Sequence, residues 1–327
     1  MAPITQYGSF TQQIANQINQ NINAAGVGFI NGNIIMLDPF AGVDTNDGIT
    51  APVNTLGRAY AIGREGKNDV IALISNGLTT SSARLGAAFT WSKNALHLVG
   101  VCDGVNLSNR ARIAPFTAAT AFANFFTLSG SGCLFQNVEI YAGFTTGTTA
   151  AICLTVTGGR NMFYNSHIVG MSDAASAADA GSRSVKISGT GENQFVNCTI
   201  GDDTTARTNA NASVEFAGGT PRNEFRSCLF PFDSGDGNSL GVKMLTGGGD
   251  RFQLFDRCMF INAIKSGGTS MTALGAISAL GGGPNGMIVY RDCGLVGIAE
   301  WEGTTKASAY VVGPAVSSSM GIGVNPA

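Results

Sequence analysis

The sequence has few charged residues, and the two signs nearly cancel. Charged side chains make up 12% of the 327 residues, against about 25% in a typical soluble domain, and the formal net charge is −2. A nucleic-acid-binding surface needs a basic patch, so we expect no nucleic-acid partner. The sequence also lacks a run of about 18 apolar residues, so we expect no membrane-spanning segment.

Histidine and tryptophan are scarce, with two of each. His97 lies in an apolar run and His167 inside a predicted strand, and no spacing brings a nucleophile to either, so we predict no catalytic triad. The seven cysteines form neither a disulfide pattern nor a CxxC zinc spacing. We therefore predict buried, reduced thiols, no metal site and no cofactor.

The first residues, MAPI, lack the basic start and apolar run of a secretory signal. Buried thiols are typical of proteins that fold in a reducing compartment. We therefore expect the chain to be made, and to fold, in a cytoplasm.

What the sequence does contain is a repeated six-residue segment. Each copy begins with an aromatic residue, has an apolar residue in sixth place, and starts 28–35 residues after the previous one. A small or thiol-bearing residue stands fourth, except in the first copy, which has Val138. The copies are Phe135–Ile140, Phe163–Ile168, Phe195–Ile200, Phe225–Phe230, Phe255–Phe260 and Tyr290–Leu295.

The repeat predicts stacked β-strands. The segments are short, apolar at near-alternate places and bounded by Gly, Asn and Asp. Most copies follow another short apolar segment, as at Ile152–Val156, Val185–Ile187, Val214–Phe216 and Val242–Leu245. A unit of strand, tight turn, strand and longer loop, repeated at this period, predicts a parallel β-helix. Inside it we expect an aromatic stack of Phe163, Phe195, Phe225, Phe255 and Tyr290. We also expect a ladder of small buried side chains at Ser166, Cys198, Cys228, Cys258 and Cys293.

The ladder resembles right-handed β-helix proteins of the pectate-lyase-like type. The segment Gly32–Gly48, GNIIMLDPFAGVDTNDG, resembles the opening segment of β-helix proteins common in bacteriophage virions. In those proteins a short strand ends in an Asp and is followed by a turn, a short helix and a buried strand. The resemblance covers about residues 32–300 and implies an all-β fold, a right-handed parallel β-helix built as a single-stranded solenoid.

Three parts of the chain differ in pattern. We predict an N-terminal docking or capping helix segment at 1–31, the parallel β-helix at 32–302, and an extended C-terminal arm or tail at 303–327. The first part carries an apolar stripe at four-residue steps without any charge, which favours either a cap on the open solenoid end or a helix that docks on another chain. The predicted docking and oligomerisation residues are Phe10, Ile14, Ile18, Ile22, Val316, Met320 and Ile322.

An acidic corner is the candidate for chemistry. The residues concerned follow two neighbouring ladder segments and are Asp202, Asp203, Asp233 and Asp236. Paired carboxylates are what glycoside hydrolysis needs, so these four would be the catalytic residues of an enzyme. Asp is also a common turn residue that faces water. A lyase would need basic residues beside the acids, and Arg207 and Lys243 are isolated in the sequence. We therefore predict that the chain is not an enzyme.

These features together predict a structural bacteriophage virion protein, a capsid decoration (cement) or head-fibre protein. It would be assembled in the cytoplasm of a bacterial host, dock on a capsid or other virion protein through its terminal segments, and form a homotrimer. Two alternatives stay open: a tailspike-type glycan hydrolase or lyase, and a non-catalytic adhesin that binds a host surface glycan. The virion role rests on the resemblance, since one fold hosts many functions.

Overall fold

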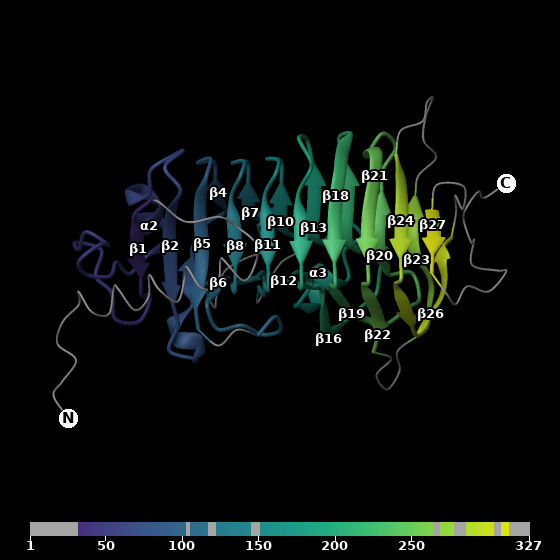
Figure 1. Ribbon diagram of the computed structural model, residues 1–327. Coiled ribbons are helices and arrows are strands. Elements are labelled where there is room, and N and C mark those ends of the chain that lie inside the picture. Colours follow the sequence, from purple (N-terminus) through teal and green to yellow (C-terminus); the bar gives the residue numbers. More distant parts are fainter. Residues whose placement is uncertain are drawn as a thin grey trace.

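The computed structural model describes residues 32–102, 105–116, 122–144, 151–263, 269–277, 286–303 and 309–313. Within these ranges the chain is an elongated stack of parallel strands (Figure 1), which confirms the predicted β-helix. All seven predicted docking residues, from Phe10 to Ile322, lie outside the described residues. None of the described helices is both long and apolar enough to cross a membrane.

The strands of successive turns form three parallel sheets, here called A, B and C. Sheet A contains β1 (Ile34–Leu37), β2 (Asp69–Ile74), β5 (Leu96–Val101), β8 (Leu134–Gln136), β11 (Met162–Tyr164), β14 (Gln194–Val196), β18 (Thr220–Arg226), β21 (Gly249–Asp256), β24 (Met287–Arg291) and β27 (Ala309–Val312). Sheet B contains β3 (Ala83–Leu85), β6 (Arg112–Pro115), β9 (Glu139–Tyr141), β12 (His167–Val169), β15 (Thr199–Ile200), β16 (Asp202–Arg207), β19 (Leu229–Ser234), β22 (Met259–Asn262) and β25 (Gly294–Val296). Sheet C contains β4 (Phe89–Trp91), β7 (Asn124–Leu128), β10 (Ile152–Val156), β13 (Arg183–Ser188), β17 (Ala212–Ala217), β20 (Leu240–Met244), β23 (Met271–Ile277) and β26 (Ile298–Glu302).

The repeated six-residue segment is two strands, not the single strand that we predicted. In Phe195–Ile200, Phe195 belongs to β14 and Ile200 to β15, and Asn197 between them has φ of 53°. Left-handed backbone turns the chain sharply, and Asn tolerates it better than most residues. The same third position has φ between 48° and 54° in every copy, at Asn137, Asn165, Asn197, Ser227, Arg257 and Asp292.

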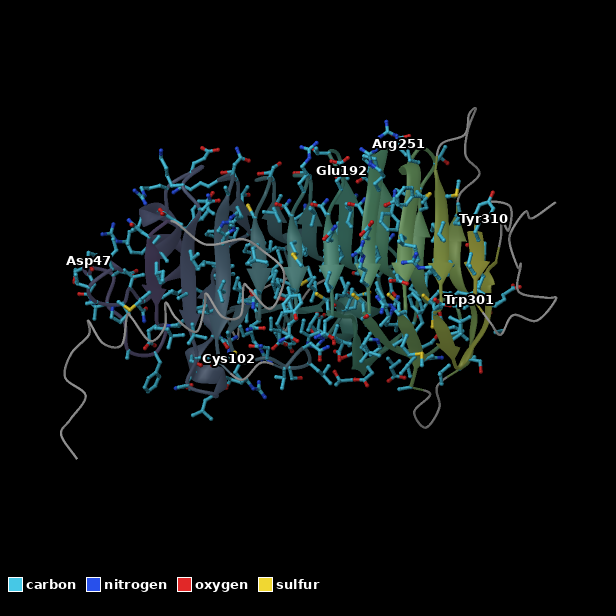
Figure 2. All side chains as sticks on the ribbon, in the orientation of Figure 1. Asp47, Cys102, Glu192, Arg251, Trp301 and Tyr310 are labelled. Atoms are coloured by element: carbon cyan, nitrogen blue, oxygen red, sulfur yellow. The ribbon has the colours of Figure 1, made fainter. Side chains whose placement is uncertain are left out.

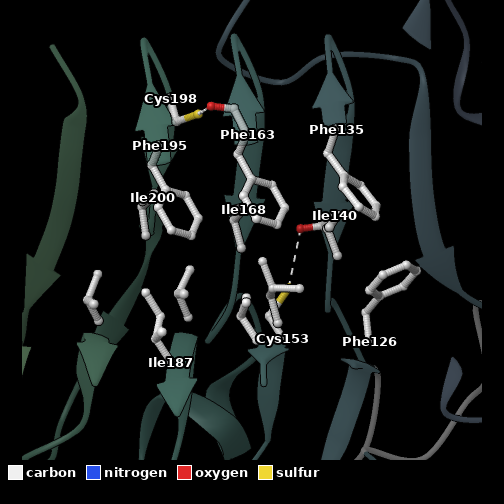
Figure 3. Packing of buried hydrophobic residues seen from close by; sticks show 14 of the residues in the cluster. Phe126, Phe135, Ile140, Cys153, Phe163, Ile168, Ile187, Phe195, Cys198 and Ile200 are labelled. Atoms are coloured by element: carbon white, nitrogen blue, oxygen red, sulfur yellow. Dashed lines mark hydrogen bonds between the residues drawn. The ribbon is translucent and has the colours of Figure 1, made fainter. Parts of the chain in front are cut away.

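The predicted aromatic stack is confirmed, and so is the ladder of small buried residues, except that its last member, Cys293, is only half-buried. The rings of Phe163, Phe195, Phe225 and Phe255 follow one another at centroid distances of 4.6 Å, close to the spacing of neighbouring strands at about 4.8 Å. Figure 3 shows Phe163 and Phe195 of this stack, with Phe135 of the preceding turn, beside Ile140, Ile168 and Ile200, which end the same segments. The thiol of Cys198 donates to the Phe163 carbonyl of the previous turn over 3.4 Å.

A buried ladder of amide side chains lines the turn between sheets C and A. The side-chain oxygen of Asn193 accepts from the backbone N–H of Asn161 at 3.1 Å, and that of Asn223 accepts from Asn193 at 3.1 Å. Gln253 continues the series by accepting from the Asn223 backbone at 3.2 Å. All four amides are buried, so each satisfies a backbone group that water does not reach.

The opening segment has the predicted order of strand, turn, helix and strand. After β1, Asp47 accepts three backbone N–H bonds within its own turn, from Ile49, Thr50 and Ala51, at one end of the solenoid (Figure 2). The Asp47 side chain thus stabilises this turn. Helix α2 (Leu56–Ile62) then starts at the cap residue Thr55, and β2 follows.

Candidate functional site

The structure places the four predicted acids on one corner of neighbouring turns. Strand β16, which contains Asp202 and Asp203, pairs with β19, which contains Asp233, so that Asp202 lies beside Phe232. Asp236 lies in the turn after β19. The predicted stacking of these two turns is therefore present, and a catalytic role for the acids stays a prediction.

Two of these carboxylates are engaged in their own turns. Asp202 accepts from the backbone and the hydroxyl of Thr204, at 2.9 and 2.7 Å. Asp236 accepts from the backbone and the side-chain amide of Asn238, at 2.9 and 3.2 Å. Asp233 is buried, whereas Asp203 is exposed. The bonds at Asp202 and Asp236 are those of ordinary polar turns.

A buried row of ionisable residues runs across sheet B. Register places Arg112, Glu139 and His167 side by side on β6, β9 and β12. The Arg112 guanidinium donates to Glu139 at 2.8 Å, and burial nevertheless raises the pKa of Glu139 to about 7. Burial lowers the pKa of His167 to about 4, and its Nδ1 accepts the backbone N–H of Ser108 at 3.0 Å. The bond from Ser108 to His167 ties the loop 105–111 to the sheet.

A pocket of about 620 Å³ lies beside that loop. In later turns two residues, the first of them left-handed, join sheets A and B, but in the second and third turns longer loops replace them. These loops line the pocket, together with the end of β5. The lining residues are Ser75, Asn76, Gly77, Val101, Cys102, Val105, Ser108 and Arg110, and none comes from sheet C.

The outer face of sheet C carries a cluster of charged residues on consecutive strands. Register aligns Lys186 of β13, Glu215 of β17 and Lys243 of β20. Arg183, also on β13, reaches Glu215 with its Nη2 at 2.6 Å and its Nε at 2.7 Å, and Lys186 reaches the other oxygen of Glu215 at 3.4 Å. We call Arg183, Lys186, Glu215 and Lys243 the sheet C cluster.

Lys243 is the unusual member of the sheet C cluster. Burial lowers its pKa, and the positive charge of Arg183 lowers it further, while Glu215 acts in the opposite direction. The Glu215 carboxylate is already bound by Arg183 and Lys186, and no described carboxylate forms an ion pair with Lys243. The cluster thus holds three cations and one anion, with one partly buried amine available. Such a group can attract an anion or, when neutral, accept a proton.

Arg207 belongs to the fold and not to an accessible site. Its side chain is buried, and it donates to the Asn211 side chain at 2.6 Å, to the Ser213 hydroxyl at 3.2 Å and to the Leu240 carbonyl at 2.7 Å. Burial lowers its pKa to about 9. This arginine braces the loop that leads into β17. Across the described residues, no group of three His, Cys, Asp or Glu side chains is placed to hold a metal ion.

Comparison with known proteins gives the fold. The sequence matches no family model and no curated protein sequence. A pectin methylesterase bound to a hexasaccharide superposes with a TM-score of 0.54 over 90% of this chain and 93% of its own, at 15% identity. A pectin methylesterase from Aspergillus niger gives 0.52 over 88% and 82%, at 14% identity, and a pectate lyase gives 0.52 over 87% and 75%, at 13% identity. The chain has their right-handed parallel β-helix fold, as the resemblance implied.

The comparison corrects one prediction and leaves another untested. Our prediction that the chain is not an enzyme is contradicted, because the solved structures that share its fold are enzymes. That prediction relied on scarce Trp and His and on a Lys243 isolated in sequence. The structure places Lys243 beside Glu215, on the same outer face as Lys186 and Arg183 one strand farther on, so the isolation was only apparent. The bacteriophage part of the resemblance stays an expectation.

The sequence held a signal for this cluster that our reasoning missed. One charged residue interrupts the same apolar strand in three successive units, as Val185-Lys186-Ile187, Val214-Glu215-Phe216 and Val242-Lys243-Met244. In a parallel stack, equivalent positions become neighbours, so this spacing was sufficient to predict the row.

Proposed function

We propose that the outer face of sheet C binds an acidic polysaccharide and cleaves it by β-elimination, with Lys243 as the base. The observation that carries the proposal is a partly buried Lys243 with a lowered pKa and no described ion-pair partner, set beside an ion-paired Arg183. The shared fold with a pectate lyase and with pectin methylesterases supports a uronic-acid glycan as the substrate class.

The charges of the cluster suit such a ligand. Even with Lys243 neutral, the two cations Arg183 and Lys186 exceed the one anion, Glu215, so a carboxylate-bearing sugar would neutralise charge on binding. The row of Lys186, Glu215 and Lys243 crosses the strands and follows the solenoid axis. A linear glycan lying along this axis would present successive carboxylates to successive turns.

The reaction requires a base next to a cation. The neutral amine of Lys243 removes the proton from the sugar carbon that bears the carboxylate. The freed electron pair forms a carbon–carbon double bond, and the glycosidic C–O bond breaks at the adjacent carbon. The leaving oxygen takes a proton from water. Lys186 and Arg183 stabilise the negative charge that develops on the carboxylate. A lowered lysine pKa increases the neutral fraction that such a base needs.

The test compares binding and cleavage for a panel of polyuronates. We expect the native chain to generate the ultraviolet absorbance of an unsaturated uronate. Lys243→Ala should reduce the rate about 10²–10⁴-fold. Lys243→Arg should retain binding but lose cleavage, because an arginine stays protonated. Lys67→Ala, at an exposed lysine away from sheet C, is the matched control and should change neither.

Other outcomes would assign the function elsewhere. Full activity in Lys243→Ala with loss in Asp202→Asn or Asp203→Asn would move the site to the acidic corner, as in a glycan hydrolase. Saturable binding without cleavage would indicate an adhesin. If no anionic glycan is bound or cleaved, the proposal is wrong.

A second proposal concerns where the protein acts. We propose that the chain is carried on a bacteriophage particle, where a β-helix of this kind would meet host surface glycans as tailspike-type proteins do. The order of strand, side-chain-stabilised turn, helix and strand at residues 34–74 supports it, being the order found in the resembling virion proteins. Immunogold labelling of purified virions tests it. Label on the tail would agree with a glycan-cleaving role, label over the head would favour a capsid decoration or head-fibre role, and unlabelled particles would refute it.

A further inference from the structure

A second apolar cluster lies on the outer face of sheet A, apart from the core. In β1, Ile35 and Leu37 belong to the core of the solenoid, so the alternating Met36 points outward. Register pairs Met36 with Ala72 and Val99 on the next two strands. The cluster, which we call the sheet A patch, consists of Met36, Val70, Ala72, Val99 and Leu134.

The sheet A patch is buried, although it faces away from the core. Met36, Val70, Ala72 and Val99 expose none of their surface and Leu134 exposes 3%. The partly buried apolar residues that pack against the patch are Ile34, Ile74, Val101, Met162 and Tyr164, and all belong to sheet A itself. A single layer of strands cannot bury its own outer face, so another segment must cover the patch.

The outer face of sheet A is apolar, and so needs a covering segment, only near the start of the solenoid. Register continues the row of Leu134 through Met162 and Gln194 to Glu224 on β18. There the outer face is polar, because Glu224 forms an ion pair with Arg226. The apolar part therefore spans β1, β2, β5, β8 and β11, which are consecutive in the sheet.

The open edge of β1 already has a cover of its own. The Met36 backbone N–H donates to the Gly48 carbonyl at 2.6 Å, and the Met36 carbonyl accepts from Val53 at 3.0 Å. Leu37 and Val53 form a parallel bridge. The loop after β1 thus folds back and satisfies the edge, so a helix is not required there.

We propose that the apolar stripe of Phe10, Ile14, Ile18 and Ile22, which lies outside the described residues, covers the sheet A patch of the same chain. Twelve residues of helix span about 18 Å. Four strand spacings, from β1 to β11, span about 19 Å. The stripe and the patch also match in chemistry, since residues 1–26 carry no charged side chain and the patch contains none.

The chain between the two segments is long enough. Ile22 and Ile34, the first residue of β1, are separated by a stretch that can reach about 40 Å when extended. A tethered segment has a high effective concentration at its own sheet, which favours this chain over a second copy. The proposal thus assigns the N-terminal segment to the side of the solenoid, and neither to its open end nor to another chain.

Photo-cross-linking of the full chain tests the contact. A benzophenone amino acid at position 18 should form adducts within β2, β5 or β8, mapped by mass spectrometry. The same label at position 16, which a helix turns to the opposite side, is the matched control and should give no such adducts. Mixing isotope-labelled and unlabelled protein distinguishes contacts within one chain from contacts between chains.

Three results would overturn the proposal: adducts in the loop 38–55, adducts between chains, or the same adducts from positions 16 and 18. A second variant pair gives an independent readout. The double variant Ile14→Asp, Ile18→Asp should expose the sheet A patch to solvent and increase the fluorescence of a hydrophobic dye severalfold. The control Asn16→Asp should leave the dye fluorescence unchanged. Unchanged fluorescence in the double variant, with the fold retained by circular dichroism, would also contradict the proposal.

Discussion

Replacing Phe225 by alanine is the strongest test of the aromatic stack. Phe225 is fully buried, and its ring lies 4.6 Å from those of Phe195 and Phe255, nearly parallel to both. Phe216 meets the same ring edge-on at 6.1 Å. The hydrogen-bonded strands fix the spacing of the turns, so the neighbouring rings cannot close the gap.

The expected cost follows from these contacts. A buried Phe→Ala change costs about 3–5 kcal/mol in unfolding free energy, and a stacked ring pair adds about 0.5–1.5 kcal/mol beyond area burial. With two stacked neighbours and little scope for collapse, we expect about 5 kcal/mol, a large part of a typical domain stability of about 5–15 kcal/mol.

Urea unfolding followed by circular dichroism measures this loss. Phe40→Ala is the matched control, because its side chain is 64% exposed and should change stability by less than about 0.5 kcal/mol. A loss below about 1 kcal/mol for Phe225→Ala would mean that the stack does not hold the turns together, and the reasoning on the ladder would fail.

Two further predictions concern pH and assembly. Burial lowers the pKa of His97 and His167 to about 4. Below about pH 6.5 the unfolded chain therefore binds more protons than the folded chain. The contribution of the two histidines to stability should fall as pH drops from about 6.5 towards 4. Glu139 acts in the opposite direction. Its pKa is raised to about 7, so its contribution to the unfolding free energy is lost as pH rises through 7. Urea midpoints measured across this pH range for His97→Gln and Glu139→Gln should separate the two effects. The homotrimer was expected from the N-terminal stripe, which we now propose covers the sheet A patch of its own chain. Light scattering of the intact chain at micromolar concentration should therefore give the mass of a monomer, and a trimeric mass would support the oligomerisation role of the stripe instead.

The fold could be predicted because its signal repeats. A single FVNCTI segment is ambiguous, but an aromatic residue at the head of six copies fixes the register of sheet A. The stack from Phe163 to Tyr290 could therefore be predicted from the sequence, and the structure extends it by Phe135. The order of strand, turn and helix after Ile34 was also predictable, since Asp47 and Thr55 have strong local preferences in turns and caps.

The division of the six-residue segment into a strand of sheet A and a strand of sheet B could not be predicted from the apolar pattern alone. A six-residue segment with a left-handed residue in its middle has the same apolar spacing as one continuous strand. Asn137, Asn165 and Asn197 were the available signal, because Asn is favoured in that backbone conformation. In later copies this position is occupied by Ser227 and Arg257, which carry no such preference, although their backbone has the same left-handed conformation.

The candidate site was harder to predict because it depends on neighbours across turns. The acids at Asp202 and Asp236 stood out in sequence, but each has a local partner that explains its presence. Lys186 and Lys243 are far apart in the chain, and only the register of sheet C shows that they lie on either side of Glu215. Distance along the chain therefore gave the wrong impression that these residues are isolated. Their equivalent positions within successive repeats would have shown that they line up.

The column of thiols has a practical consequence. Cys198, Cys228 and Cys258 lie on three consecutive turns, each buried and each donating to a carbonyl of the turn before it. A thiol reagent can reach one of them only after its own turn opens. Measured residue by residue, the rates of alkylation would therefore report the opening of the solenoid turn by turn, with native side chains as the probes.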